Sequence, residues 1–294
     1  MKTTFSRGAS FAVVAVAYAC AAAVGWLAFQ YASLLHITNP ALALFVADLA
    51  ATLVIFISSV LANNTSMYDS YWSTAPPLLA WQMLVLAAPG VPSARQILVM
   101  VLIIFWAVRL TFNFLRGWPG LHHEDWRFVD MRIQTRRAYW LVSLTALHLI
   151  PTAIVYLACW GLWPALATST RPLNPWDGVA AVVGFCAVML ELVADEQLRR
   201  FRADPAHAGR AIDSGVWRTS RHPNYLGEIG FWWGVALFAF AAKPSWWVFG
   251  GAIVITAMFV FATIPLAEKR ALARRPDYAA RLASTRMLLP WPPR

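Results

Sequence analysis

Charged residues are scarce in this sequence of 294 amino acids: only 13% are Asp, Glu, Lys or Arg, while 60% are hydrophobic. A soluble domain carries roughly twice that share of charge. The scarcity therefore excludes a soluble globular protein and indicates an integral membrane protein. The net charge of +10 is then a sign of membrane topology, and it gives no reason to expect a nucleic-acid partner.

Motifs that hold thiols, metals or nucleotides are also missing. Cys20, Cys159 and Cys186 fall in apolar stretches without a C-x-x-C pair, which excludes a disulfide framework. Six histidines are too few for the histidine boxes of membrane di-iron desaturases. No G-x-G-x-x-G and no P-loop motif occurs, so neither nucleotide pocket is expected. His122-His-Glu-Asp125 are adjacent rather than spaced along one face, and we expect no metal site.

Long apolar segments are what the sequence has instead. Eight of them cover about residues 10–36, 40–62, 76–90, 95–115, 138–164, 176–194, 225–242 and 244–266. Most are long enough to cross a bilayer as helices, which takes roughly 17–25 residues. The third is short and flanked by prolines, so a partial helix is an alternative there. We expect an all-α, polytopic integral membrane helical bundle of seven to eight transmembrane helices, forming one transmembrane domain over residues 1–294.

Positive charge is concentrated in four segments. They are the N-terminus and residues 116–137, 199–221 and 268–294. With eight crossings all four lie on one membrane face, which the positive-inside rule identifies as cytoplasmic. Arginines that simply meet lipid headgroups at helix ends are the alternative explanation for much of this charge.

The segment Arg218-Thr-Ser-Arg-His-Pro-Asn-Tyr-Leu-Gly-Glu228 is the most distinctive in the chain. Pro223 suits the first turn of a helix, because its missing N–H has no partner there. Arg218, Arg221 and His222 then crowd the positive end of that helix, where a phosphate or carboxylate binds readily. Glu228 follows one turn inside an apolar stretch, where an acid is costly without a partner or a function.

A second polar pattern leads out of the sixth apolar segment. Glu191, Asp195, Arg199 and Arg202 stand at spacings of 4, 4 and 3 and so share one helical face. The acids suit hydrogen bonds from an amide or ribose hydroxyls, and the arginines suit phosphates. An internal ladder in which Asp195 pairs with Arg199 is the structural alternative.

Candidate proton donors lie in the N-terminal half. Asp48 is inside the second apolar segment, and ionisable groups at such positions usually have a function. Mutual neutralisation with Arg109 of the fourth segment is the alternative. Met67-Tyr-Asp-Ser-Tyr-Trp-Ser73 places Asp69 between Tyr68 and Tyr71, a combination suited to proton donation. An interfacial aromatic belt with Asp69 as a turn cap is the alternative.

Ser220-Arg-His-Pro-Asn-Tyr-Leu-Gly-Glu228 followed by Trp232-Trp-Gly234 resembles the C-terminal signature of the steroid 5-alpha-reductase-like membrane proteins. The likeness is greatest to their bacterial branch, formerly of unknown function, which is related to the isoprenylcysteine methyltransferase-like superfamily. Tyr68-Asp-Ser-Tyr-Trp-Ser73, Glu124-Asp-Trp-Arg127 and Glu268-Lys-Arg, with Pro276-Asp-Tyr278, extend the resemblance from about residue 60 to the C-terminus.

This resemblance implies an enzyme, an NADPH-dependent reductase of a carbon–carbon double bond conjugated to a ketone in a lipophilic, steroid-like or isoprenoid substrate. It implies that residues 1–115 form the substrate side and residues 116–294 the cofactor half, with the cofactor site and C-terminus on the cytoplasmic side of a bacterial inner membrane. Membrane lipid is the other expected partner, and the oligomeric state is open. The expected cofactor-binding residues are Glu191, Asp195, Arg199, Arg202, Arg218, Arg221, His222, Asn224, Tyr225, Gly227, Glu228 and Tyr278.

The substrate half departs from the family's pattern, because the segment Arg109–Arg116 has no tyrosine to match. We take Asp69 with Tyr68 or Tyr71 as the catalytic group and Asp48 as the alternative. A membrane S-adenosylmethionine-dependent methyltransferase of the isoprenylcysteine type stays open, although its cofactor has no phosphates to bind arginines. A non-catalytic lipid-binding protein also stays open, but it leaves several intramembrane acids without a purpose.

Overall fold

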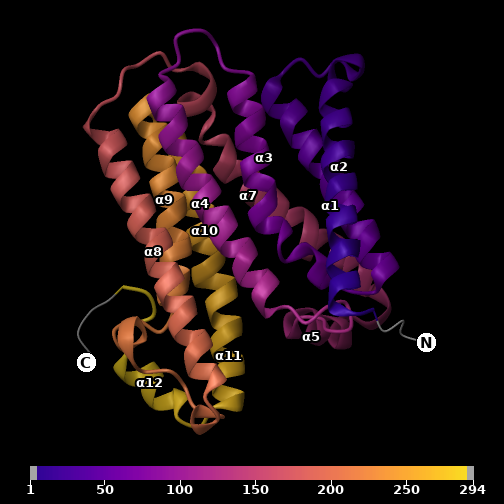
Figure 1. Ribbon diagram of the computed structural model, residues 1–294, viewed down its shortest axis with the longest axis vertical. Coiled ribbons are helices and arrows are strands. Elements are labelled where there is room, and N and C mark those ends of the chain that lie inside the picture. The colour runs from indigo at the N-terminus through magenta and orange to yellow at the C-terminus, as the bar shows by residue number, and fades with distance from the viewer. Residues whose placement is uncertain (1–4, 290–294) are drawn as a thin grey trace. The chain divides into compact units, whose positions relative to one another are not determined.

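Helices form the regular structure of the computed structural model, which describes residues 5–289. The α-helices are α1 (Arg7–Gln30), α2 (Pro40–Ala62), α3 (Tyr71–Val85), α4 (Ser93–Gly117), α5 (Trp126–Thr135), α6 (Tyr139–Val142), α7 (Ile150–Trp160), α8 (Pro175–Ala203), α9 (Pro223–Ala242), α10 (Gly250–Met258), α11 (Ile264–Arg274) and α12 (Tyr278–Ser284). Within residues 5–289 there is no β-strand and one isolated bridge, between Ser220 and Arg286. The all-α prediction is confirmed (Figure 1).

Seven helical runs among the described residues are long and apolar enough to cross a membrane. They are Arg7–Gln30, Pro40–Ala62, Ser93–Gly117, Trp126–Thr168, Pro175–Ala203, Pro223–Ala242 and Trp246–Arg274. Each corresponds to one of the eight predicted segments, which confirms the polytopic bundle. The remaining segment forms α3, a helix of 15 residues with Pro76 and Pro77 inside it. These prolines withhold two backbone donors, and α3 is shorter than a full crossing requires.

Backbone contacts divide the chain into two compact units. The first runs to Leu86 and resumes over Trp106–Trp160, so it holds α1–α3, the second part of α4 and α5–α7. The second comprises Ala87–Phe105 and the chain from Gly161 onward, with the first part of α4 and α8–α12. The predicted functional boundary between residues 115 and 116 stays a prediction.

Small residues bring α1 and α2 together in the first unit. A β-carbon on Gly25 would lie 3.1 Å from the carbonyl oxygen of Ala47 and 3.3 Å from Cβ of Ala51. The start of α2 is fixed by Asn39, whose side chain accepts from the backbone N–H of Ala41, with Pro40 as the first helical residue. This close packing places the middle of α2, with Asp48, beside α1.

The second unit is built on an even closer contact between α8 and α9. A β-carbon on Gly234 would lie 2.6 Å from Cα of Gly184, and one on Gly227 would lie 2.7 Å from the carbonyl oxygen of Ala187. Such an approach suits membrane helices, because dispersion contacts replace a hydrophobic driving force that lipid does not provide. The G-x-x-x-G spacing of Gly230 and Gly234 therefore serves helix packing.

A buried ion pair anchors the first turn of α4 to the first turn of α8. Arg95 donates to Asp177 at 2.7 and 2.9 Å and to the carbonyl oxygens of Arg171 and Pro172. Asp177 also completes a capping box with Asn174. Because both charges are fully hydrogen-bonded, the pair fixes these helix ends without leaving an unpaired buried charge.

Candidate functional site

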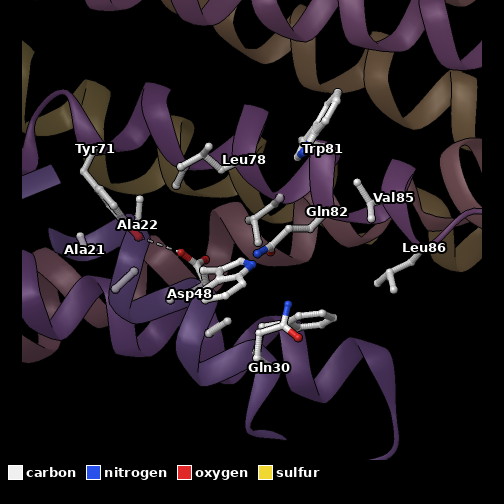
Figure 2. A pocket seen from close by; sticks show the side chains of 17 residues that line it. Ala21, Ala22, Gln30, Asp48, Tyr71, Leu78, Trp81, Gln82, Val85 and Leu86 are labelled. Atoms are coloured by element: carbon white, nitrogen blue, oxygen red, sulfur yellow. Dashed lines mark hydrogen bonds between the residues drawn. The ribbon is translucent and has the colours of Figure 1, made fainter. Parts of the chain in front are cut away.

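A cavity of about 260 Å³ lies among α1, α2 and α3 in the first unit (Figure 2). Its lining is almost wholly apolar and includes the indole rings of Trp26 and Trp81. Apart from the indoles, the polar side chains in the lining are Gln30, Asp48, Tyr71 and Gln82. A cavity with an apolar wall and few convergent polar groups is the usual form of a site for a lipophilic small molecule.

Asp48 and Tyr71 form a hydrogen-bonded pair in this cavity. The Tyr71 hydroxyl donates to Oδ1 of Asp48 at 3.0 Å, and Asp48 is only 5% exposed. Oδ2 of Asp48 is buried and has no hydrogen-bond partner among the residues that the structure describes. A buried polar atom without a partner is costly in a protein interior, so this oxygen is suited to a ligand in the cavity.

Three more hydroxyls surround the pair and hold it in place. The hydroxyl groups of Thr52 and Thr152 are 2.9 Å apart, and Thr152 lies 2.8 Å from the hydroxyl of Tyr68. Tyr71 is hydrogen-bonded to Thr52 as well as to Asp48. The result is a buried polar cluster from α2, α3, α7 and the turn Thr65–Tyr68, and networks of this kind rigidify the groups they contain.

Replacing Thr152 with valine is expected to destabilise the protein by about 1–3 kcal/mol, because it removes the partner of the buried Tyr68 hydroxyl and one of the two partners of Thr52. The midpoint of thermal unfolding of the detergent-purified protein measures this. Thr152→Ser keeps the hydroxyl, so its loss of stability should be smaller. Thr145, whose hydroxyl is exposed and bonds to its own helix at Leu141, provides the matched control Thr145→Val. Equal losses in all three variants would contradict the network.

Asp69, the first-choice acid of the sequence prediction, lies elsewhere in the same unit. It is half-buried in the connection between α2 and α3, and its carboxylate is 3.3 Å from the guanidinium of Arg127. Burial raises the pKa of the Asp69 carboxyl to about 7, with Arg127 opposing the shift. The structure thus directs the Tyr71 hydroxyl to Asp48, while Asp69 contacts Arg127 at the start of α5 and does not line the cavity.

The segment His122–Asp125 is accounted for by structural contacts. Glu124 accepts from the backbone N–H of Thr65 at 2.9 Å, from the Tyr139 hydroxyl at 3.2 Å and from Arg132 at 3.1 Å. Asp125 caps the N-terminus of α5. Across residues 5–289, no group of three or more His, Cys, Asp or Glu side chains is placed to hold a metal ion.

The helical face predicted to bind a cofactor lies on α8 in the second unit. Glu191 is buried next to Gly227 of α9, and Asp195 is partly buried one turn further along. Arg199 donates to Glu196 at 2.6 and 2.8 Å, so its present acidic partner is Glu196. Arg202 is exposed and has Asp195 among its charged neighbours. The four residues share the face that their spacing predicts, with Arg199 turned toward its own helix.

The motif at the start of α9 is held by an acid on α11. Arg221 donates to Oε1 of Glu268 at 2.7 Å, and Nε2 of His222 lies 3.0 Å from the same oxygen. Arg221 also donates to the carbonyl oxygen of Thr285. Burial lowers the pKa of His222, with Glu268 opposing the shift. Two of the residues predicted to bind an anion, Arg221 and His222, are therefore already held by Glu268 of α11.

The remaining residues of the motif Arg218–Glu228 also lie at or near the start of α9. The ring of Tyr225 stacks on His222, with centroids 5.3 Å apart and planes 4° from parallel. Asn224 has a buried side-chain oxygen with no hydrogen-bond partner within residues 5–289. Glu228 is buried and accepts from the indole N–H of Trp232 at 3.0 Å. Arg218 is exposed.

Tyr278, at the start of α12, belongs to the same group of residues as Arg221 and Glu268. Burial raises the pKa of its hydroxyl to about 12, and Glu268 adds to the shift. The carboxylate of Asp277 accepts from the backbone N–H of Ala211 at 2.9 Å. These contacts keep the C-terminal segment close to the start of α9, where the motif Arg218–Glu228 lies.

Sequence reasoning missed four residues of these two sites. Glu268 is an acid in a strongly basic segment, and this isolation could have indicated that it pairs with a cation of the site. Thr52, Thr152 and Gln82 gave none, because polar residues of this type are common in membrane helices and their partners lie far away in the sequence. Only the fold brings Thr52 and Thr152 together across 100 residues.

Comparison with known proteins identifies the family. No solved structure matches the chain. A protein of Schizosaccharomyces pombe, described as uncharacterised, is 27% identical over an alignment of 274 residues, and the match covers 85% of this chain and 79% of that protein. A family profile described as a protein of unknown function, DUF1295, matches residues 55–285. The match takes in Tyr71, α8, α9 and Glu268, while Asp48 precedes it. Because the profile covers most of the sequence, the chain belongs to the DUF1295 family.

Proposed function

We propose that this membrane protein is an NADPH-dependent reductase of a carbon–carbon double bond conjugated to a ketone in a lipophilic substrate. The observation that carries the proposal is the hydrogen-bonded pair of Asp48 and Tyr71, which lines an apolar cavity and has one buried carboxyl oxygen without a partner among the described residues. An apolar wall selects a lipophilic molecule, and a single acidic group is the arrangement needed to polarise one carbonyl oxygen and to deliver a proton.

Asp48 and Tyr71 have different parts in this proposal. Oδ2 of a protonated Asp48 donates a hydrogen bond to the substrate's ketone oxygen, where negative charge develops during reduction. Tyr71 holds Oδ1 and fixes the orientation of the carboxyl group. The saturated ketone requires one hydride at the β carbon and one proton at the α carbon, and Asp48 or Tyr71 supplies that proton. The apolar wall excludes water from the reacting bond.

The residues of the second unit fit a dinucleotide phosphate. Arg202 and Arg218 are exposed cations suited to phosphate groups. The buried side-chain oxygen of Asn224 has no hydrogen-bond donor within the described residues, and the carboxamide of the nicotinamide ring would provide one. Asp195 is suited to accept a hydrogen bond from a ribose hydroxyl. When bound, NADPH supplies the hydride. Arg199, Arg221 and His222 would exchange or share their present carboxylate partners to join this site. We place this site and the C-terminus on the cytoplasmic side.

Ligand-dependent stabilisation tests the proposal. NADPH at a hundredfold excess over its dissociation constant is expected to stabilise the detergent-purified protein by about 2.7 kcal/mol, seen as a rise in the unfolding temperature. Asp195→Ala should remove that rise, while Asp204→Ala, an exposed acid at the end of the same helix, should keep it. Stabilisation by S-adenosylmethionine without any by NADPH would identify a methyltransferase instead.

A further inference from the structure

The helix α5 lies at the end of the membrane helices of the first unit. The helical run Trp126–Thr168 has 43 residues, about twice the length of a crossing, so its later part is sufficient for one. Arg132 of α5 donates to Asn63 at 3.1 Å, and Glu124, just before α5, accepts from the backbone N–H of Thr65 at 2.9 Å. These two partners directly follow α2, so α5 lies at the level where α2 ends, at the lower end of the unit in Figure 1.

The surface of α5 has an apolar part that no described residue covers. Phe128 is buried, whereas Val129 is 38% exposed and Ile133 is 68% exposed. Val129 and Ile133 are four residues apart and so share one face of the helix. A helix that combines arginines with an exposed apolar face is typical of segments that lie in the headgroup region of a membrane.

Two arginines directly follow α5 and differ from the arginine within it. Arg132 is paired with Glu124 at 3.1 Å. The side chains of Arg136 and Arg137 are exposed and make no hydrogen bond or ion pair with any residue in the range 5–289. Two adjacent guanidinium groups repel each other, and an anion bound to both removes this repulsion.

The backbone at Arg136 indicates that its side chain has a function. Arg136 has φ 47° and ψ −112°, a combination that glycine adopts readily and that other residues adopt only under strain. The turn does not need a side chain here, because the Arg136 N–H that closes α5 on the carbonyl oxygen of Arg132 is equally present in glycine. Backbone strain of this kind is concentrated at binding and switch sites. The guanidinium, rather than the turn, therefore accounts for an arginine at this position.

We propose that α5 and the turn after it bind an anionic phospholipid. Its acyl chains contact Val129 and Ile133. Its headgroup phosphate accepts hydrogen bonds from Arg136 and Arg137, because the guanidinium group matches phosphate oxygens in both geometry and charge. Anionic lipids are concentrated in the cytoplasmic leaflet, where the positive-inside rule also predicts this part of the chain. None of these four residues lines the cavity of Asp48, so the proposal does not depend on the proposed reductase.

Native mass spectrometry of the full-length protein in detergent, titrated with phosphatidylglycerol or phosphatidylcholine, tests this. The unchanged protein should bind phosphatidylglycerol roughly twentyfold more tightly, since each arginine near an anionic headgroup contributes about fivefold. Arg136→Gln combined with Arg137→Gln should remove this preference. Ile133→Ser should weaken the binding of phosphatidylglycerol severalfold, because it removes apolar contact. Arg200→Gln changes an exposed arginine of α8 that is paired with Glu196, and this control should leave binding unchanged.

Arg136→Gly separates binding from stability. It should weaken the binding of phosphatidylglycerol about fivefold, yet raise the unfolding temperature of the lipid-free protein, because glycine relieves the strained backbone. A fall in that unfolding temperature would give Arg136 a structural role and overturn the inference. Equal binding of the two lipids by the unchanged protein, or a preference that survives in the double variant, also overturns it. Displacement of phosphatidylglycerol by an equal concentration of glycerol phosphate would show a site for free phosphate rather than lipid.

Discussion

Asp48→Asn is expected to lower the turnover of a lipophilic enone by at least about a hundredfold, the usual contribution of a positioned general acid. Asparagine has nearly the same shape, and its carbonyl oxygen still accepts the hydrogen bond from Tyr71 that holds the side chain. It has no proton to release, so the ketone oxygen loses its acidic partner. Turnover measured with NADPH in detergent gives the result.

Asp69→Asn is the control for this experiment. Asp69 has a raised pKa of about 7, which also suits proton transfer near neutral pH, but it lies outside the cavity lining. We therefore expect Asp69→Asn to keep most of the activity. A hundredfold loss in Asp69→Asn with full activity in Asp48→Asn would assign the proton to the connection between α2 and α3, as the sequence alone suggested.

Tyr71→Phe separates the two groups of the pair. Loss of its hydroxyl leaves Oδ1 of Asp48 without a partner, so the carboxyl group is free to turn away from the productive orientation. We expect a smaller loss in turnover than in Asp48→Asn, because the acid itself remains. Both variants should retain stabilisation by NADPH, which shows that the second unit is folded.

The sequence predicts the helices well, because membrane helices are read from length and composition alone. Seven of the eight apolar segments became full-length helices, and the short third segment was already marked by its prolines. The shared face of Glu191, Asp195, Arg199 and Arg202 follows in the same way from helical periodicity. What periodicity does not give is the partner of each charge, and Arg199 binds Glu196, three residues away, rather than Asp195.

The candidate sites were harder to predict because they depend on contacts between distant segments. Asp48 and Tyr71 are 23 residues apart on different helices, while Asp69 and Tyr71 are neighbours in the sequence. Proximity in the sequence favoured Asp69 as the partner of Tyr71, whereas the Tyr71 hydroxyl donates to Asp48 of another helix. Near neighbours along a helix point in different directions, so closeness in the sequence does not bring their side chains together. The partnership of Arg221 and His222 with Glu268 likewise spans more than 40 residues, so no local pattern contains it.

Gly227→Ala is expected to destabilise the protein by about 2–3 kcal/mol, at the upper end of the usual effect of overpacking. An added β-carbon would lie 2.6 Å from Cβ of Glu191, 2.7 Å from the carbonyl oxygen of Ala187 and 2.9 Å from the Glu191 amide nitrogen. Two of these three atoms belong to the backbone of α8, so a change of rotamer does not relieve the contact and the helices must separate. The unfolding temperature in detergent measures the loss.

Gly178→Ala provides the control, since the same change on α8 places a β-carbon in open space. There alanine should stabilise the helix by about 0.5–1 kcal/mol, because glycine loses more backbone freedom on folding. The two variants should therefore differ in sign. If Gly227→Ala unfolds at or above the temperature of Gly178→Ala, the close approach of α8 and α9 is not what holds Glu191. If Gly227→Ala destabilises the protein and Gly178→Ala does not, the added methyl group has separated α8 from α9. That separation also moves Glu191 and Asp195 away from the start of α9. Gly227→Ala should therefore weaken NADPH binding, although glycine has no side chain to touch the cofactor.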